Sequence, residues 1–232
     1  MRRRTVGGEV AALAMLERPA ARAAGLEEGC PDDCPFCAEA IKSSSSPFDR
    51  ILASGPGTRL LPALGMLVPG YFLVTTEDHV LAMSALGVGL LRQIDAWVSE
   101  LEATLTPLFG PYVRFEHGSC ADDLAGACVD HAHIHLAPVA DTVTVDGGGA
   151  WTRIDGFSDL ARCAGTSYAY FASGRSHLLM PRPRLGSQWI RRQIAATLRT
   201  DAWDWAVDTG EAALKETLDR LRGVTLPSVG TG

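Results

Sequence analysis

The sequence lacks the features of a membrane-spanning or nucleic-acid-coating protein. None of its apolar runs approaches the roughly 20 residues that are needed to cross a bilayer. The 232 residues carry a formal net charge of −6. This charge argues against broad binding to nucleic acid, although it leaves room for a small nucleotide in a local pocket. We therefore expect neither a membrane nor a nucleic-acid partner.

Signals for secretion and for a phosphate-binding loop are also missing. The apolar patch that follows the basic start is interrupted by Glu9 and Glu17, and no clean cleavage site is visible. The chain contains six cysteines, but a chain of this length does not need disulfides to be stable. The stretch GPGTR at 55–59 has no Lys-Ser/Thr and therefore predicts only a turn. We expect a cytoplasmic protein.

What the sequence does contain is a globular composition, with 47% hydrophobic and 21% charged residues. Strand-like segments and one amphipathic helix predict an antiparallel α+β fold. We expect two strands within 64–79 joined at Pro69-Gly70, further strands at 112–119 and 129–139, a helix near 86–105 closed by Pro107, and a hairpin around Gly174. Two more helices are expected at 187–199, capped by Ser187, and at 210–223. This pattern suggests an arm (1–25), a catalytic domain (26–140) and a C-terminal extension of hairpin and helices (141–232).

The stretch CVDHAHIHLAPV places histidines at alternate positions. In a strand, His131, His133 and His135 would share one face, because successive side chains point to opposite sides. A neutral imidazole can attack a phosphorus atom and form a covalent intermediate that water or another acceptor resolves. A metal-binding triad and a merely solvated strand face are the alternatives.

The stretch CPFC supplies a second cluster. Cys34 and Cys37 have the Cys-x-x-Cys spacing of half a tetrahedral zinc site, although a redox pair or two buried cysteines would look the same. No second Cys-x-x-Cys exists, so the remaining zinc ligands would be histidines. The natural candidates are His79, at a predicted strand end, and one member of the 131–135 set.

HAHIHLA resembles the His-x-His-x-His-x-x signature of the histidine-triad superfamily of nucleotide hydrolases and transferases. VPGYFLVTTEDH, ending in a histidine, and the upstream CPFC are similar to segments of its zinc-binding members, so the resemblance spans about 30–140. It implies a histidine-triad fold, with His133 as the nucleophile and His135 assisting the phosphate or the leaving group. It also implies a structural zinc ion held by Cys34, Cys37, His79 and His131.

Two flanking segments depart from the hydrolase pattern. Gly126-Ala127-Cys128 replaces the usual Gly-Gln-Ser/Thr and resembles the Gly-Ala-Ser of the galactose-1-phosphate uridylyltransferase and diadenosine-tetraphosphate phosphorylase branch of the superfamily. FEHG resembles the same branch, with His117 in place of an asparagine. That branch ends its motif in glutamine, whereas this chain has His135, which favours hydrolysis.

Other residues are candidates for binding the substrate. His117 could donate to phosphate or be structural, Glu116 could bind a hydroxyl or be an ordinary loop charge, and Cys128 could donate weakly or simply pack. At the helix start near 187, Gln188 and Arg191 could face an anionic ligand.

Three functions are consistent with these patterns. They are a nucleotide hydrolase acting through a covalent nucleotidyl-histidine, a nucleotidyltransferase or phosphorylase, and a zinc-stabilised protein that only binds a nucleotide. Each predicts a nucleotide ligand. Family members are often homodimers, which makes a homodimer an expected assembly; the alternative is that the extension covers that surface.

Overall fold

The computed structural model describes residues 34–120, 129–139, 143, 145 and 151–229. Within them an antiparallel sheet of eight strands runs in the order β1-β2-β3-β5-β4-β7-β8-β6. Its strands are β1 (Ala53–Gly55), β2 (Thr58–Pro62), β3 (Phe72–Thr76), β4 (Val113–Gly118), β5 (His133–Ala137), β6 (Thr152–Ile154), β7 (Tyr168–Ser173) and β8 (Ser176–Pro181). The helices are α2 (Ala38–Ser43), α3 (Val88–Phe109), α4 (Trp189–Leu198) and α5 (Glu211–Arg220), with short 3-10 segments η1 (Pro47–Asp49), η2 (Met83–Ala85) and η3 (Phe157–Cys163). The predicted α+β class, with its long helix and C-terminal helices, is confirmed.

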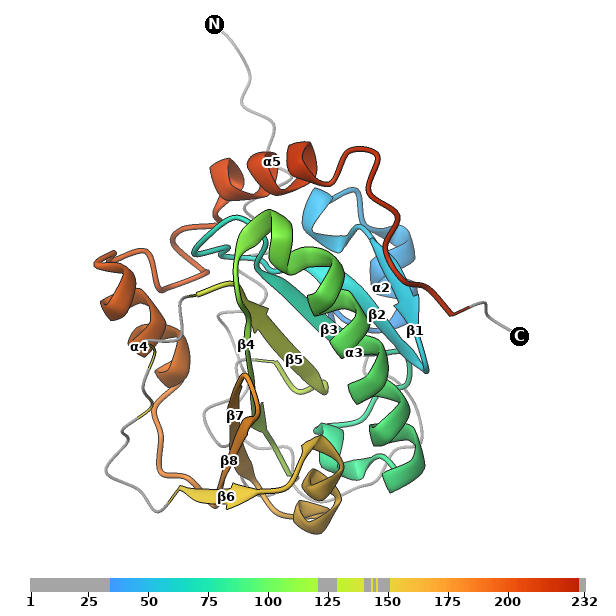
Figure 1. Ribbon diagram of the computed structural model, residues 1–232, viewed down its shortest axis with the longest axis vertical. Coiled ribbons are helices and arrows are strands. Elements are labelled where there is room, and N and C mark those ends of the chain that lie inside the picture. The colour runs from blue at the N-terminus through green and yellow to red at the C-terminus, as the bar shows by residue number, and fades with distance from the viewer. Residues whose placement is uncertain (1–33, 121–128, 140–142, 144, 146–150, 230–232) are drawn as a thin grey trace, which may run out of the picture.

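The long helix α3 covers one face of the sheet (Figure 1). Its buried side chains recur at helical spacing, and they pack against alternate residues of the central strands, such as Ile134 and Leu136 of β5. The helix continues past the predicted stop at Pro107 and ends at Phe109, where Gly110 adopts a φ of 100°. Among the described residues, no helix is long and apolar enough to cross a membrane.

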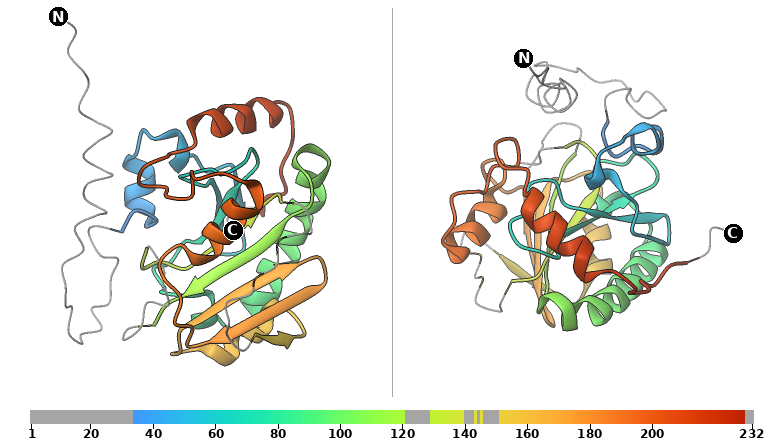
Figure 2. Two further views of the ribbon diagram at one scale, coloured as in Figure 1. Left: turned by 90° about the vertical axis from the view of Figure 1, so that its left-hand side faces the viewer. Right: turned by 90° about the horizontal axis from the view of Figure 1, so that it is seen from above.

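The opposite face of the sheet is covered by segments from the two ends of the described chain. Phe48 of η1, Ile190 and Ile194 of α4, and Leu214 of α5 pack there against strand residues such as Phe115. Figure 2 shows α4 on the side of the sheet away from α3, whereas the C-terminal end of α5 reaches α3, where Arg220 donates to the Leu108 carbonyl at 2.8 Å. Because β5 alternates between the two faces, its histidines point toward this second layer.

The C-terminal region continues the sheet. The hairpin β7–β8 forms around Gly174 as predicted, and β7 pairs with β4 from Val113↔Ser173 to Gly118↔Tyr168. The boundary expected at 140 therefore falls inside one sheet. The last described residues run beside the edge strand β1, where the Val229 amide donates to the Ser54 carbonyl at 2.8 Å.

Two local predictions were wrong. Residues 64–68, expected to be a strand, form a turn, and the strand before β3 is β2 instead. Gly65 has a φ of 71° and a Cβ there would meet Trp205, so tertiary contact with the C-terminal region shapes this apolar run. Ser187 is not the helix cap: α4 begins at Trp189 after Gln188, which adopts the left-handed conformation with no side-chain cap.

Candidate functional site: a metal cluster beside a histidine-lined cavity

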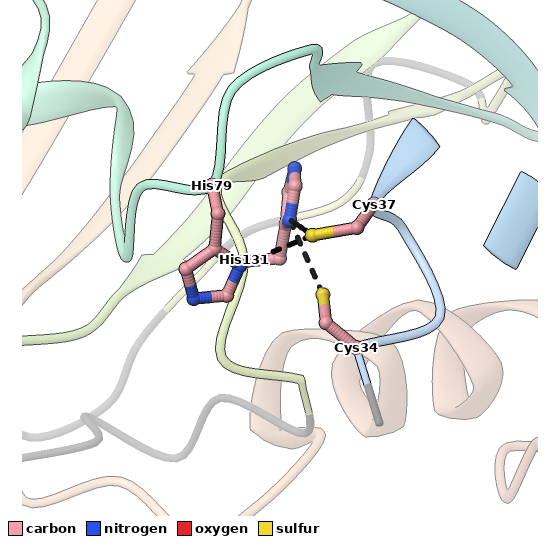
Figure 3. Close-up of side chains that lie close together, drawn as sticks. All are labelled: Cys34, Cys37, His79 and His131. Atoms are coloured by element: carbon pink, nitrogen blue, oxygen red, sulfur yellow. Dashed lines mark hydrogen bonds between the residues drawn. The ribbon is translucent and has the colours of Figure 1, made fainter. Parts of the chain in front are cut away.

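Four potential metal ligands converge at one end of β5 (Figure 3). Cys34 and Cys37 lie just before α2, His79 follows β3, and His131 precedes β5. All four ligand atoms lie within 4.8 Å of one another. The Cys34 sulfur is 3.4 Å from Nδ1 of His131, and the Cys37 sulfur is 3.5 Å from Nδ1 of His79. This cluster can hold a metal ion.

Backbone contacts decide which nitrogen of His131 faces the sulfurs. Its Nε2 donates to the Thr76 carbonyl at 2.9 Å, because a carbonyl can only accept. The lone pair of the neutral ring is therefore on Nδ1, the atom that faces both cysteines. Burial lowers the pKa of His131 to about 4, which keeps the ring neutral. A partner on the far nitrogen is the usual support of a metal-binding histidine.

His133 has the opposite orientation to His131, because its Nδ1 and not its Nε2 faces a carbonyl. Its Nδ1 donates to the His131 carbonyl at 2.6 Å, so its lone pair is on Nε2. The side chain is buried, and burial lowers its pKa. His133 therefore has a neutral imidazole with an unprotonated Nε2, the form that a nucleophile requires.

His135 lies on the same face, between aromatic neighbours. It stacks on Phe115 at 4.4 Å between ring centroids, and its Nδ1 lies 2.9 Å from the Tyr71 hydroxyl. The ring centroid of His133 is 4.9 Å away. Burial and the neighbouring His133, Arg191 and His117 hold its pKa well below the ordinary range.

Two further polar side chains flank His133 across the strands. Thr75 of β3 pairs with His133, and its buried hydroxyl has no hydrogen-bond partner within the described chain. On β4, the pairing of Phe115 with His135 places His117 across from His133 on the same face. Nε2 of His117 is likewise buried without a partner among the described residues, and burial lowers its pKa to about 4. Buried polar atoms without a partner are rare in folded proteins, so these two atoms are candidates for contact with a ligand.

His117, His133 and His135 line a cavity of about 920 Å³. Phe36 and the residues around Phe48 form one wall, and the C-terminal segment from Gln188 to Leu218 contributes another. The cavity is large enough for a nucleotide-sized ligand.

The two candidates from the C-terminal helix both reach this cavity. Gln188 donates through Nε2 to Asp204 at 3.3 Å, and its Oε1 is buried without a partner in the described structure. The guanidinium of Arg191 is buried and donates to the carbonyls of Gly65 and Trp203. Part of the Arg191 donor capacity is therefore used to attach α4 to the 63–71 loop.

The structure does not bring every predicted residue together. Glu116 lies on the α3 face of the sheet, opposite the histidines, where it accepts from the Met83 amide at 2.9 Å and from the Tyr168 hydroxyl. It is fully buried, and burial raises its pKa to about 7. Cys128 lies outside the described residues.

Sequence reasoning missed Tyr71, Thr75 and Phe36. Tyr71, Leu73 and Thr75 alternate along the predicted strand YFLVTT, so the period of two could have grouped them. Only the pairing of β3 with β5 shows that this group shares the histidine face. Phe36 lies inside CPFC, and its ring centroid is 5.4 Å from that of His133, but the spacing of the cysteines does not predict this contact.

Fold and site together define an α+β protein with a potential metal centre and a histidine-lined cavity along one strand. No protein-family model matches the sequence, and no curated protein matches it. Solved structures of histidine-triad type do match. A Hit-like protein from Bartonella henselae, described as involved in cell-cycle regulation, has 15% identity and a TM-score of 0.36, covering 58% of this chain and 96% of that one. Yeast Ap4A phosphorylase Apa2 has 12% identity and a TM-score of 0.38, and the match covers 84% of this chain and 85% of that one. The same enzyme in complex with AMP has 14% identity and a TM-score of 0.41, and the match covers 84% of this chain and 82% of that one.

Proposed function

We propose that this protein hydrolyses a nucleoside 5′-phosphoryl bond through a covalent nucleotidyl intermediate on His133. One observation carries the proposal: the donation from Nδ1 of His133 to the His131 carbonyl leaves an unprotonated Nε2 on a residue that lines the cavity. A nucleophile that attacks phosphorus needs such a lone pair, and His133 directs it into the cavity while lying outside the four-residue metal cluster.

The two steps balance as follows. Nε2 attacks the α-phosphorus, a nitrogen–phosphorus bond forms, and the bond to the leaving group breaks as that group takes up a proton. Water then attacks the phosphorus, the nitrogen–phosphorus bond breaks, and the nucleoside monophosphate leaves. The proton that water releases replaces the one taken by the leaving group, and His133 returns to its neutral form.

The neighbours of His133 would stabilise the phosphoryl oxygens. His117 and His135 line the same cavity, and the positive charge of Arg191 lies close enough to lower the pKa of His135. Oriented donors and a nearby cation favour the charge that develops on phosphoryl oxygens. Gln188 is the proposed contact for another part of the substrate.

We also propose that the metal is zinc. Bond lengths of about 2.3 Å to sulfur and 2.0 Å to nitrogen in a tetrahedron place sulfur and nitrogen about 3.5 Å apart. The observed sulfur–nitrogen distances of 3.4, 3.5 and 3.9 Å fit this value. Bound zinc would fix Cys34, Cys37, His79 and His131 relative to one another as a closed structural centre.

The test is a panel of dinucleoside polyphosphates, nucleoside phosphoramidates and nucleotide sugars, quenched early and examined by intact-protein mass. We expect a gain of one nucleoside monophosphate that is absent in His133→Ala, followed by release of the free monophosphate. If the nucleotidyl group leaves the protein only when an acceptor is added, the reaction is nucleotidyl transfer and not hydrolysis. Turnover of any substrate at an unchanged rate in His133→Ala would refute the mechanism.

A further inference from the structure

The C-terminal segment reaches the triad through a chain of three side chains, of which Arg191 and Tyr71 are buried and His135 is half-buried. Arg191 of α4 donates through Nη2 to the Gly65 carbonyl at 2.7 Å, and through Nε and Nη2 to the Trp203 carbonyl at 3.1 and 3.0 Å. These bonds fix the guanidinium above the Tyr71 ring, 5.5 Å from its centroid. Tyr71 in turn contacts His135. Helix α4 therefore contacts His135 of the central strand β5 indirectly, through Tyr71.

Tyr71 is a positioning residue, because it is fully buried and is not among the residues that line the cavity. Its hydroxyl lies 2.9 Å from Nδ1 of His135. On the other side, the parallel stack with Phe115, at an interplanar angle of 4°, fixes the plane of the imidazole. With its plane and Nδ1 both held, His135 can present only Nε2 to other partners.

The direction of the Tyr71–His135 bond follows from the charge beside it. A guanidinium over the face of a phenol withdraws electron density from the ring, which makes the hydroxyl a better donor and a poorer acceptor. His133, His117, Arg191 and Tyr71 all face His135, and none of them offers it a carboxylate that would favour the imidazolium. The neutral ring thus accepts at Nδ1 and keeps its hydrogen on Nε2.

We propose that Tyr71, held under Arg191, donates its hydroxyl hydrogen to Nδ1 of His135 and so maintains His135 as the Nε2–H tautomer. His133 is fixed as the opposite tautomer by the His131 carbonyl. Two neighbouring histidines thus present a lone pair and an N–H group. The catalytic value of this pairing rests on the proposed function: one ring attacks phosphorus while the other donates to a phosphoryl oxygen.

The tautomers can be read directly by long-range ¹H–¹⁵N NMR of protein labelled at histidine, purified with its metal under reducing conditions. His135→Gln assigns the His135 signals, and His133→Gln those of His133. We expect the Nε2–H pattern for His135 and the Nδ1–H pattern for His133. In Tyr71→Phe, the His135 signals should move toward the other tautomer. An Nδ1–H pattern for His135 in the unmodified protein, or no change in Tyr71→Phe, would overturn the proposal whatever the enzyme does.

Kinetics supply the second readout. Tyr71→Phe should lower kcat about 10- to 100-fold with little change in KM, as expected when one donor to the transition state is misplaced. Thr217→Val is the matched control, because it removes the hydroxyl that accepts from the Gly70 amide at 2.7 Å, one residue from Tyr71, and leaves the phenol in place. An equal loss of kcat in both variants would mean that loosening of the loop, and not the Tyr71 bond, is responsible. Tautomers as expected in a protein without turnover would uphold the positioning of His135 and refute only the proposed function.

Discussion

The metal cluster and the cavity meet on one short stretch of chain, and they use the same residue type in opposite ways. His131 turns Nε2 to a carbonyl and offers Nδ1 to two sulfurs, whereas His133 turns Nδ1 to a carbonyl and offers Nε2 to the cavity. Burial keeps both rings neutral. The carbonyl that accepts from each ring thus determines which nitrogen of that histidine carries the lone pair.

The two regions are also connected. The carbonyl that orients His133 belongs to His131, whose ring faces the cysteines. Fixing His131 by a metal ion would therefore fix the acceptor on which the orientation of His133 depends. A bound metal ion would brace the cavity through His131 and through Phe36, which lies between the two cysteines and lines the cavity. Substitutions on either side should separate the two roles.

The largest effect is expected from His133→Ala. Removal of the nucleophile should lower turnover about 10³-fold or more, while nucleotide affinity and metal content stay close to those of the unmodified protein. Steady-state kinetics, calorimetric titration and elemental analysis measure the three quantities. His177→Ala is the control, because His177 is a partly buried histidine of β8 that contacts Tyr170. A loss of metal in His133→Ala would show that the two regions are not separable.

Cys34→Ala should have its main effect on the other region. With one thiolate missing we expect less than one zinc ion per chain and a free energy of unfolding lower by about 3 kcal/mol, or roughly 10 °C in Tm. Activity should fall less than in His133→Ala, because His133 itself is retained. Cys163→Ala is the matched control, since Cys163 is a buried free thiol outside the cluster. Unchanged zinc content in Cys34→Ala would contradict the proposed ligand set.

The smallest effect on catalysis is expected at Glu116, on the far face of the sheet. Burial raises its pKa from 4.5 to about 7, although the bonds from Tyr168 and Met83 act in the opposite direction. The folded state therefore holds a proton that the unfolded state releases, so its contribution to stability is full below about pH 4.5 and is lost as the pH rises to about 7. The change amounts to about 3 kcal/mol.

Glu116→Gln should remove this dependence while leaving KM unchanged. Urea unfolding at several pH values measures the first effect, and the exposed Glu100→Gln on α3 is the control. A large rise in KM in Glu116→Gln would instead support the hydroxyl-binding role that the sequence suggested.

The sequence predicted the Cys34–Cys37 half of the metal cluster and the central strands because both depend on local spacing, whereas the choice of His131 as a ligand came from the family resemblance. CPFC and the alternating histidines are visible within a few residues, and the helical period of α3 spans one segment. The cavity wall was harder, because Gln188, Arg191 and Trp205 reach it only through the packing of the C-terminal segment. Glu116 illustrates the limit: it is adjacent to His117, yet strand alternation places the two on opposite faces.

The cavity draws its walls from Pro35 at one end of the described chain to Leu218 near the other. Strand β5, with the proposed nucleophile, ends at Ala137. During synthesis a ribosome thus releases His133 many residues before the C-terminal segment that forms part of the cavity wall. Because domains fold as units as their sequence becomes complete, a nascent or truncated chain would carry the nucleophile in an open groove. If His133 is the nucleophile, its chemistry would become selective only when α5, the last helix of the described residues, has docked.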